Sequence, residues 1–169
     1  MTQKVFGITG WKNAGKTTLT ERLVHELTKR GYSISTVKHA HHSFDIDKQG
    51  TDSYRHREAG AHEVAIVSFN RWAIMHELRE TTEPPLDEIL SRMMPCDLIL
   101  VEGYKNDKHP KIEIRRKGSP TQIPLDAEQY SIVAIASDEP ISEQNVPVLD
   151  LNNIAGLTDF IENYCGLKR

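Results

Sequence analysis

The chain has 169 residues, of which 38% are hydrophobic and 27% are charged, so it is long enough to bury a core and has no bias toward disorder. Its 21 Lys and Arg against 24 Asp and Glu give a formal charge of -3, which provides no general attraction for nucleic acid. Two distant cysteines, no apolar signal segment and no stretch of membrane-spanning length predict a single cytoplasmic domain over residues 1–169 without a membrane partner.

The first elements along the chain predict strand, loop, helix and strand. The apolar run at residues 5–9 is typical of a buried strand. Leucines then recur every fourth residue from Leu19 to Leu27, which indicates a helix, and Gly31 is placed to end it. A second strand follows at residues 32–38. A crossover of this kind normally joins two parallel strands, so we expect an α/β protein.

The rest of the chain predicts further strands and helices, with an antiparallel excursion near residues 63–77. In chain order they are a short helix at 52–58, a hairpin with strands at 64–67 and 72–75, an amphipathic helix from Leu86 that Pro95 ends, a buried strand at 98–101, a half-exposed strand at 111–115, strands at 132–136 and 148–151, and a last helix from Ile154 to Tyr164 capped by Asn152 or Asn153. This alternation favours a mostly parallel sheet with helices on both faces.

Residues 10–17 carry the strongest functional signal. They fit G-x-x-x-x-G-K-[ST] at every fixed position, between a predicted strand and a predicted helix. Such a loop directs backbone amides at phosphate oxygens, which predicts binding of a purine nucleoside triphosphate. Lys16 would bridge the outer phosphates and assist catalysis, and the Thr17 hydroxyl would bind Mg²⁺. The predicted nucleotide contacts are Gly10, Trp11, Lys12, Asn13, Ala14, Gly15, Lys16, Thr17 and Thr18.

A second magnesium ligand follows from the sheet. Ligands of parallel sheets gather at the carboxyl ends of the strands, where the phosphate loop also lies. Asp97 precedes the strand at 98–101 and would lie at the opposite edge, whereas Glu102 follows it. We therefore expect Glu102 on the metal side, with a solvent-facing glutamate in a turn as the alternative.

The loop after the second strand is rich in titratable side chains, namely His39, His41, His42, Asp45 and Asp47. Its position at the same edge favours a mobile switch or substrate-binding loop, in which Asp45 or Asp47 would orient the attacking water. The histidines leave two alternatives open, a transition-metal site and a site for an anionic partner ligand.

Asp138 follows the strand at 132–136 and is also expected at the binding edge. Its carboxylate would accept hydrogen bonds from guanine N1 and N2, which would favour guanine over adenine. The alternative is a turn cap before Pro140.

With these residues in place, the chain resembles the MobB family of molybdopterin-guanine dinucleotide biosynthesis adapter proteins over nearly its whole length. The segments that carry the resemblance, besides the phosphate loop, are 36–39 with His41 and His42, 44–47, 50–53, 59–61 and 101–105. The resemblance implies a P-loop GTPase fold, bound GTP, a homodimer and weak GTPase activity. It further implies a role in assisting the guanylyltransferase MobA, which attaches GMP to the molybdopterin cofactor.

Two other classes of function use the same phosphate loop. A small-molecule kinase would need a lid that excludes water, for which Arg55, Arg57, Arg115 and Arg116 are candidates. A GTPase that delivers nickel or zinc would bind the metal through the histidine loop. As an enzyme, we expect at most slow hydrolysis of GTP to GDP and phosphate, because the sequence identifies no activating glutamine or arginine finger.

Overall fold

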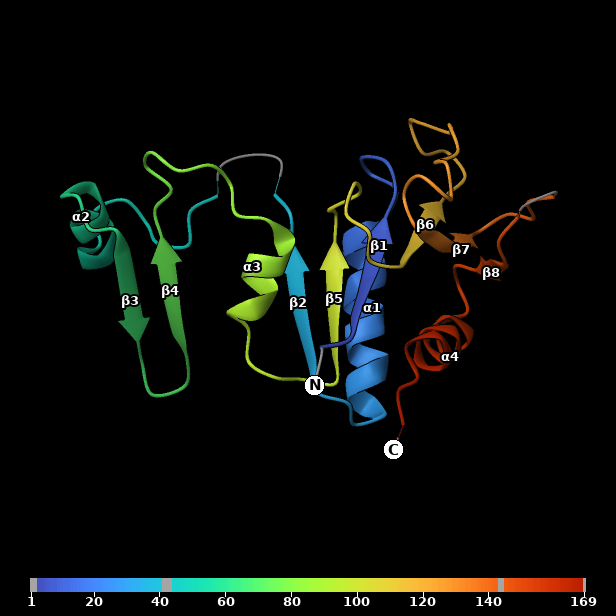
Figure 1. Ribbon diagram of the computed structural model, residues 1–169, viewed down its shortest axis with the longest axis horizontal. Coiled ribbons are helices and arrows are strands. Elements are labelled where there is room, and N and C mark those ends of the chain that lie inside the picture. The colour runs from blue at the N-terminus through green and yellow to red at the C-terminus, as the bar shows by residue number, and fades with distance from the viewer. Residues whose placement is uncertain (1–2, 41–43, 143–144, 169) are drawn as a thin grey trace. The chain divides into compact units, whose positions relative to one another are not determined.

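The computed structural model describes residues 3–40, 44–142 and 145–168. The chain divides into two compact units, which are best considered separately (Figure 1). The first unit contains Met1–His39 and Met93–Arg169, and the second contains Ala40–Arg92. The phosphate loop lies in the first unit.

A six-stranded sheet organises the first unit, and every neighbouring pair in it is parallel. The strand order is β2-β5-β1-β6-β7-β8. The strands are β1 (Val5–Thr9), β2 (Ile34–Lys38), β5 (Leu98–Glu102), β6 (Lys111–Arg115), β7 (Ile132–Ser137) and β8 (Val148–Asp150). Because β1 lies between β5 and β6, the loop that follows it opens at the middle of the sheet. The predicted parallel α/β fold class is confirmed.

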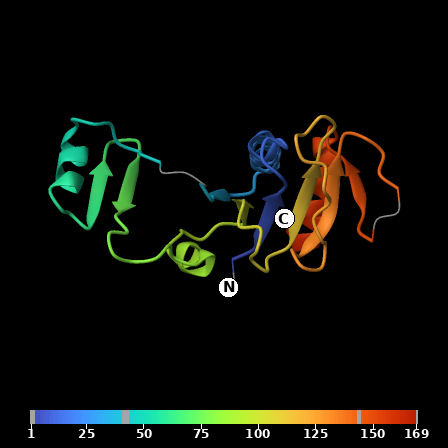
Figure 2. The same ribbon diagram turned by 90° about the horizontal axis from the view of Figure 1, so that it is seen from above.

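Two helices of this unit pack on one face of the sheet. They are α1 (Lys16–Lys29) and α4 (Ile154–Cys165), which contact each other. Figure 2 shows α1 beside the sheet. Alternate side chains of the central strands, such as Phe6 and Ile8, share one fully buried core with the leucines of α1. The cap of α4 is Asn153, whose side chain accepts a hydrogen bond from the Gly156 amide at 3.0 Å.

Strand β6 is buried on its other face as well, so the prediction of a half-exposed strand is wrong. Lys111 and Glu113 are buried, with 0% and 1% of their surface exposed. The Lys111 ammonium donates to the carbonyls of Asp107, His109 (2.8 Å) and Tyr130 (3.1 Å). Loops 103–110 and 116–130 therefore cover this face, and they supply the polar partners that let charged residues alternate with isoleucines in a buried strand.

The second unit contains an antiparallel hairpin, β3 (Glu63–Val67) and β4 (Trp72–His76), as the sequence predicts. Its turn is closed by the Ser68 amide, which donates to the Arg71 carbonyl at 2.8 Å. Helix α2 (Asp52–Glu58) precedes the hairpin and α3 (Leu86–Ser91) follows it. Among the described residues, no helix has the length and apolar character needed to span a membrane.

Candidate functional site: the phosphate loop and its neighbours

The loop between β1 and α1 has the backbone that its glycines allow. Gly10 has φ 145°, Gly15 has φ 94°, and Asn13 also has a positive φ of 65°. A Cβ atom at Gly10 would lie 3.0 Å from the Ile114 carbonyl oxygen, so the loop lies close against β6. Both glycines are therefore required by the backbone conformation, and Gly10 also by the close approach to β6.

The N-terminus of α1 presents free amide groups to this loop. The first intrahelical bond runs from the Leu19 amide to the Gly15 carbonyl at 3.0 Å, so the amides of Lys16, Thr17 and Thr18 precede it. Gly15 is the N-cap residue and brings no side chain to satisfy them. An anion placed there would be bound by these amides and by the helix dipole.

The Lys16 side chain folds back over the phosphate loop. Its ammonium donates to the carbonyls of Gly10 (3.0 Å) and Trp11 (2.8 Å). Burial lowers the pKa of Lys16, the carboxylate of Glu102 raises it, and the ammonium of Lys38 lowers it. The side chain is thus held at the centre of the loop, in position to meet phosphate oxygens.

The two predicted magnesium ligands lie together. Glu102 ends β5, beside Ile8 of β1, and is buried. Its Oε1 accepts a hydrogen bond from the Thr17 hydroxyl at 2.8 Å. A hydroxyl and a carboxylate are the oxygen ligands that Mg²⁺ prefers, so the residues present fit this ion. Asp97 lies at the other end of β5, where its carboxylate accepts hydrogen bonds from the amide and hydroxyl of Ser33, both at 2.7 Å.

The histidine loop is described only in part. His41 and His42 lie outside the described residues, so the switch, anion-binding and transition-metal hypotheses stay predictions. The His39 ring lies 4.6 Å from the Tyr104 ring, measured between centroids. In the described parts of the chain, no group of three or more His, Cys, Asp and Glu residues is arranged to hold a metal ion.

Two cations at the site were not assigned to the nucleotide by sequence reasoning. Lys38 ends β2, and its Nζ lies 3.4 Å from Glu102 Oε1 and 3.3 Å from Thr17 Oγ1. Arg116 directly follows β6, and its Nη1 lies 3.7 Å from the position of a Cβ atom on Gly15. The carboxyl-end rule that selects Glu102 also selects these two residues.

Asp138 is engaged with the segment that follows β6. Its Oδ1 accepts a hydrogen bond from the Lys117 amide at 2.8 Å, and its Oδ2 lies 3.7 Å from Nε of Arg116. These contacts fix the start of loop 116–130 beside the phosphate loop. Recognition of guanine by this carboxylate stays a prediction. It requires a guanine base to contact an Asp138 oxygen in addition to the Lys117 and Arg116 contacts.

Trp11 joins the phosphate loop to both neighbouring loops. Its indole Nε1 donates to the Ile123 carbonyl at 2.6 Å. The Lys105 ammonium lies 4.9 Å from the centroid of the Trp11 ring and 5.0 Å from that of Tyr130. Such cation–π contacts and the indole hydrogen bond hold Trp11 in one position. The phosphate loop is therefore connected through Trp11 to loops 103–110 and 116–130.

Asp45 and Asp47, the predicted water-orienting residues, belong to the second unit. Nη2 of Arg57 donates to Asp45 at 3.0 Å and to Asp47 at 2.9 Å, and its Nη1 lies 3.5 Å from Glu77. The Asp47 side chain is only 2% exposed. Both aspartates thus have an ion-pairing role within their own unit, and a role in hydrolysis is a prediction that these contacts leave untested.

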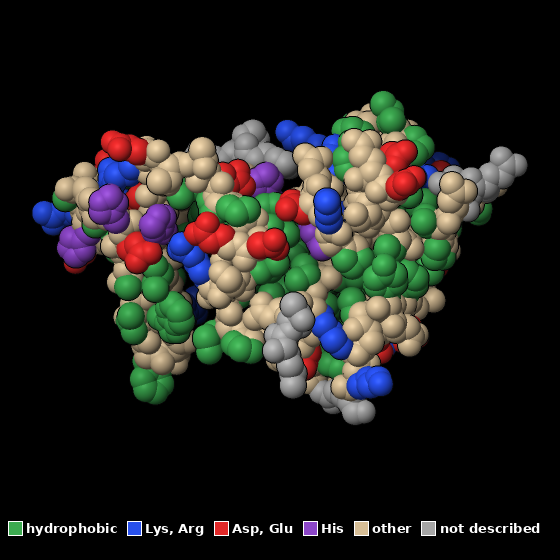
Figure 3. Space-filling model, viewed as in Figure 1, with side chains coloured by type: hydrophobic (Ala, Val, Ile, Leu, Met, Phe, Trp, Pro, Cys, Tyr) green, Lys and Arg blue, Asp and Glu red, His purple; other side chains and the backbone are tan. Residues whose placement is uncertain are grey.

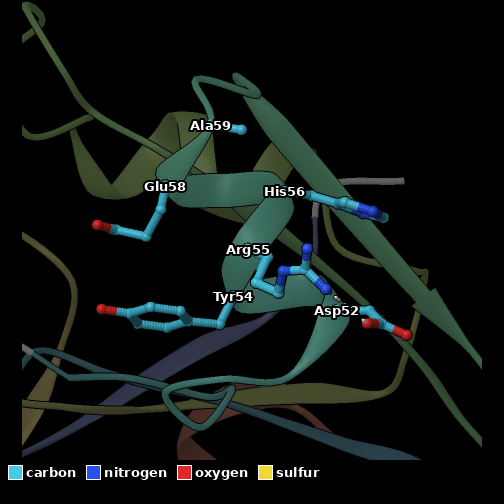
Figure 4. Close-up of a pocket in the computed structure, with 6 residues that line it drawn as sticks. All are labelled: Asp52, Tyr54, Arg55, His56, Glu58 and Ala59. Atoms are coloured by element: carbon cyan, nitrogen blue, oxygen red, sulfur yellow. Dashed lines mark ion pairs between the residues drawn. The ribbon is translucent and has the colours of Figure 1, made fainter.

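A surface hollow runs along α2 in the same unit. It is lined by Asp52, Tyr54, Arg55, His56, Glu58 and Ala59 (Figure 4). Tyr54 and Glu58 extend to one side of the helix and His56 and Asp52 to the other (Figure 4). Because one short helix supplies the whole lining, the hollow lacks the convergent polar groups of an enclosed substrate site.

Comparison with known proteins gives a consistent result. Residues 5–138 match the family model described as "Molybdopterin guanine dinucleotide synthesis protein B". A molybdopterin-guanine dinucleotide biosynthesis adapter protein of Escherichia coli is 40% identical over 156 residues, which cover 89% of this chain and 87% of that protein. A protein of the same description from Haemophilus influenzae is 39% identical over 163 residues, which cover 95% of this chain and 88% of that one.

Solved structures agree with the fold. A structure described as molybdopterin-guanine biosynthesis protein B superposes with a TM-score of 0.73 at 23% identity, covering 96% of this chain and 99% of that chain. A crystal structure described as a MobB protein homologue from Bacillus stearothermophilus superposes with a TM-score of 0.66 at 25% identity, covering 97% of this chain and 99% of that chain.

Proposed function

This chain belongs to the MobB family, and we propose on that basis that it is an adapter in molybdopterin-guanine dinucleotide biosynthesis that binds GTP with Mg²⁺. The adapter role follows the description of the relatives from E. coli and H. influenzae. The nucleotide would lie with its phosphates on residues 10–18, as the loop sequence indicates.

The contact between Thr17 and Glu102 is the observation that carries the nucleotide proposal. A P-loop protein holds its magnesium between the loop hydroxyl and an acid from a neighbouring strand. Here the hydroxyl and the carboxylate come from α1 and β5, 85 residues apart, and lie 2.8 Å from each other. The ion would supply charge that offsets the phosphates, and Lys16 would add a second positive charge within the loop.

Hydrolysis of GTP is proposed to be slow. The residues that reach the phosphate loop supply binding and charge, which position the triphosphate. Asp45 and Asp47 are engaged by Arg57, so orienting a water would require that ion pair to open or be shared. Such a protein would act chiefly through its nucleotide-bound state, which suits an adapter.

The proposed partners are the guanylyltransferase MobA, the molybdopterin cofactor and a second copy of this chain, in the cytoplasm. The hairpin β3–β4 supports pairing with a second copy, because a two-stranded sheet alone is marginally stable and neither outer edge of this one pairs with another strand among the described residues. Its exposed side chains include Val67, Phe69 and Trp72. Figure 3 shows hydrophobic side chains gathered on the surface of this hairpin. A second hairpin carries the same edges and apolar side chains, so the two would pair symmetrically.

A nucleotide titration tests the proposal. The chain has two tryptophans, so replacing Trp72 by Phe leaves Trp11 as a fluorescent reporter inside the phosphate loop. GTP and ATP would be titrated with Mg²⁺ into this variant and into its Lys16→Ala derivative, with Lys29→Ala as the control at the far end of α1. Loss of a charge-assisted contact should weaken triphosphate binding about 10- to 100-fold in Lys16→Ala only.

Equal GTP affinity with and without the Lys16 ammonium would remove the proposal. A preference for ATP would remove GTP as the ligand while leaving the loop assignment in place. Capture of the guanylyltransferase by the immobilised chain, compared in the presence and absence of GTP, tests the adapter role separately.

A further inference from the structure

The Lys38 ammonium occupies a defined place beside the two magnesium ligands. Its Nζ lies 3.3 Å from Thr17 Oγ1 and 3.4 Å from Glu102 Oε1, and these two oxygens are 2.8 Å apart. The three atoms form a compact triangle. Lys16, by contrast, directs its ammonium to the carbonyls of Gly10 and Trp11. The two lysines therefore make different direct contacts, Lys38 with the two magnesium ligands and Lys16 with loop carbonyls, although the charge of Glu102 acts on both.

A magnesium ion and this ammonium would compete for Glu102. Mg²⁺ binds oxygen at about 2.0–2.1 Å, so an ion on Thr17 Oγ1 would lie within about 5.4 Å of the present position of Lys38 Nζ. At such a separation a dication repels an ammonium, and it also competes with the ammonium for the Glu102 carboxylate. Entry of the ion would therefore weaken the Lys38–Glu102 contact and favour release of the lysine.

The burial of the two partners fits such an exchange. The Lys38 side chain is 59% exposed, so its ammonium can turn into solvent at little cost. The Glu102 side chain is only 10% exposed, so its carboxylate needs a cation when no metal is bound. One partner is free to move, whereas the other is fixed at the end of β5.

We propose that Lys38 is a displaceable counter-ion, which neutralises the magnesium site in the nucleotide-free chain and is released when Mg²⁺ and the triphosphate bind. This inference rests on the proposed nucleotide function and adds a property to it. The free energy of the Lys38–Glu102 pair opposes metal entry, so Lys38 sets how much Mg²⁺ the chain needs in order to hold GTP. The lysine thereby keeps the empty site from binding a metal without the nucleotide.

The test measures binding across a series of free Mg²⁺ concentrations, with Trp11 fluorescence in the Trp72→Phe background as the signal. The variants are Lys38→Met, which removes the ammonium, and Lys38→Arg, which keeps a cation. Lys29→Met is the matched control, because it makes the same charge change on the last turn of α1. The half-saturating Mg²⁺ concentration should fall about two- to fivefold in Lys38→Met, the factor expected for a partly exposed ion pair. Lys38→Arg and Lys29→Met should match the parent.

Three results would overturn the proposal. An unchanged magnesium requirement in Lys38→Met means that the lysine does not compete with the ion. A higher requirement, or weaker GTP binding at saturating Mg²⁺, means that Lys38 contacts the phosphates. Failure of the parent chain to bind GTP at any Mg²⁺ concentration is a distinct pattern, which removes the proposed function and the displacement together.

Discussion

Acid should destabilise this protein through His109, a residue that the phosphate chemistry does not use. Its ring lies against the backbone of β1, where a Cβ atom on Gly7 would be 2.6 Å from Nε2. Both ring nitrogens are buried, and neither has a hydrogen-bond partner among the described residues. Burial, and secondarily the Lys111 ammonium, lower the pKa of His109 from 6.5 to about 4.

The free energy of unfolding depends on pH because the unfolded chain protonates His109 at a higher pH than the folded chain does. The unfolded chain protonates this histidine near pH 6.5 and the folded chain near pH 4, so the free energy of unfolding falls as the pH drops between these values. A shift of this size corresponds to at most about 3 kcal/mol, at 1.36 kcal/mol for each pKa unit. Above pH 6.5 the histidine is neutral in both states and contributes no pH dependence.

Urea unfolding followed by circular dichroism, between pH 7.5 and pH 4, measures this loss. His109→Leu should remove the histidine's share of the slope, and near pH 7.5 it should be as stable as the parent, because it replaces two unsatisfied nitrogens by apolar atoms. His109→Asn also removes the slope but leaves polar atoms buried, so it separates titration from packing. Parallel acid destabilisation of the parent and both variants would refute the assignment to His109.

Three further predictions concern particular contacts. Gly10→Ala should lower the free energy of unfolding by about 1–3 kcal/mol, since its Cβ atom would lie 3.0 Å from the Ile114 carbonyl at a φ of 145°, and an unchanged urea midpoint would contradict this. Glu113→Ala should cost about 3 kcal/mol or more in the same assay, because the carboxylate lies 2.7 Å from Nη2 of Arg115, and Glu113→Gln should lose less. Asn153→Ala should lower Tm by about 2–4 °C through loss of the α4 cap. If Asn152→Ala lowered Tm by the same amount, the effect would not be specific to the cap residue.

Strand positions and the direction of the sheet were accessible to sequence reasoning because they depend on local patterns. The apolar run of β5 has the length of a buried strand, and its flanking acids lie at opposite ends of it. Parallel pairing then decides which acid meets the phosphate loop, and the structure has Glu102 beside Thr17 and Asp97 beside Ser33. No long-range contact had to be guessed for this step.

The buried face of β6 was not accessible in the same way. Alternation of Lys111, Ile112 and Glu113 is what a strand with one solvated face would also have. What buries this face is the set of carbonyl and amide groups from loops 103–110 and 116–130. The sequence periodicity does not predict the course of these loops. The Leu125 amide, which donates to Glu113 at 3.0 Å, is an example of a partner that only the folded chain reveals.

These buried charges connect the stability of the fold to the geometry of the candidate site. The Lys111 ammonium ties the carbonyl of His109 to that of Tyr130, and so joins the two loops behind β6. The same two loops carry Lys105 and Ile123 to the Trp11 side chain. A polar network on the rear face of the sheet thus determines where the loops meet the phosphate loop, and a pattern that looks like surface in the sequence supports the position of Trp11.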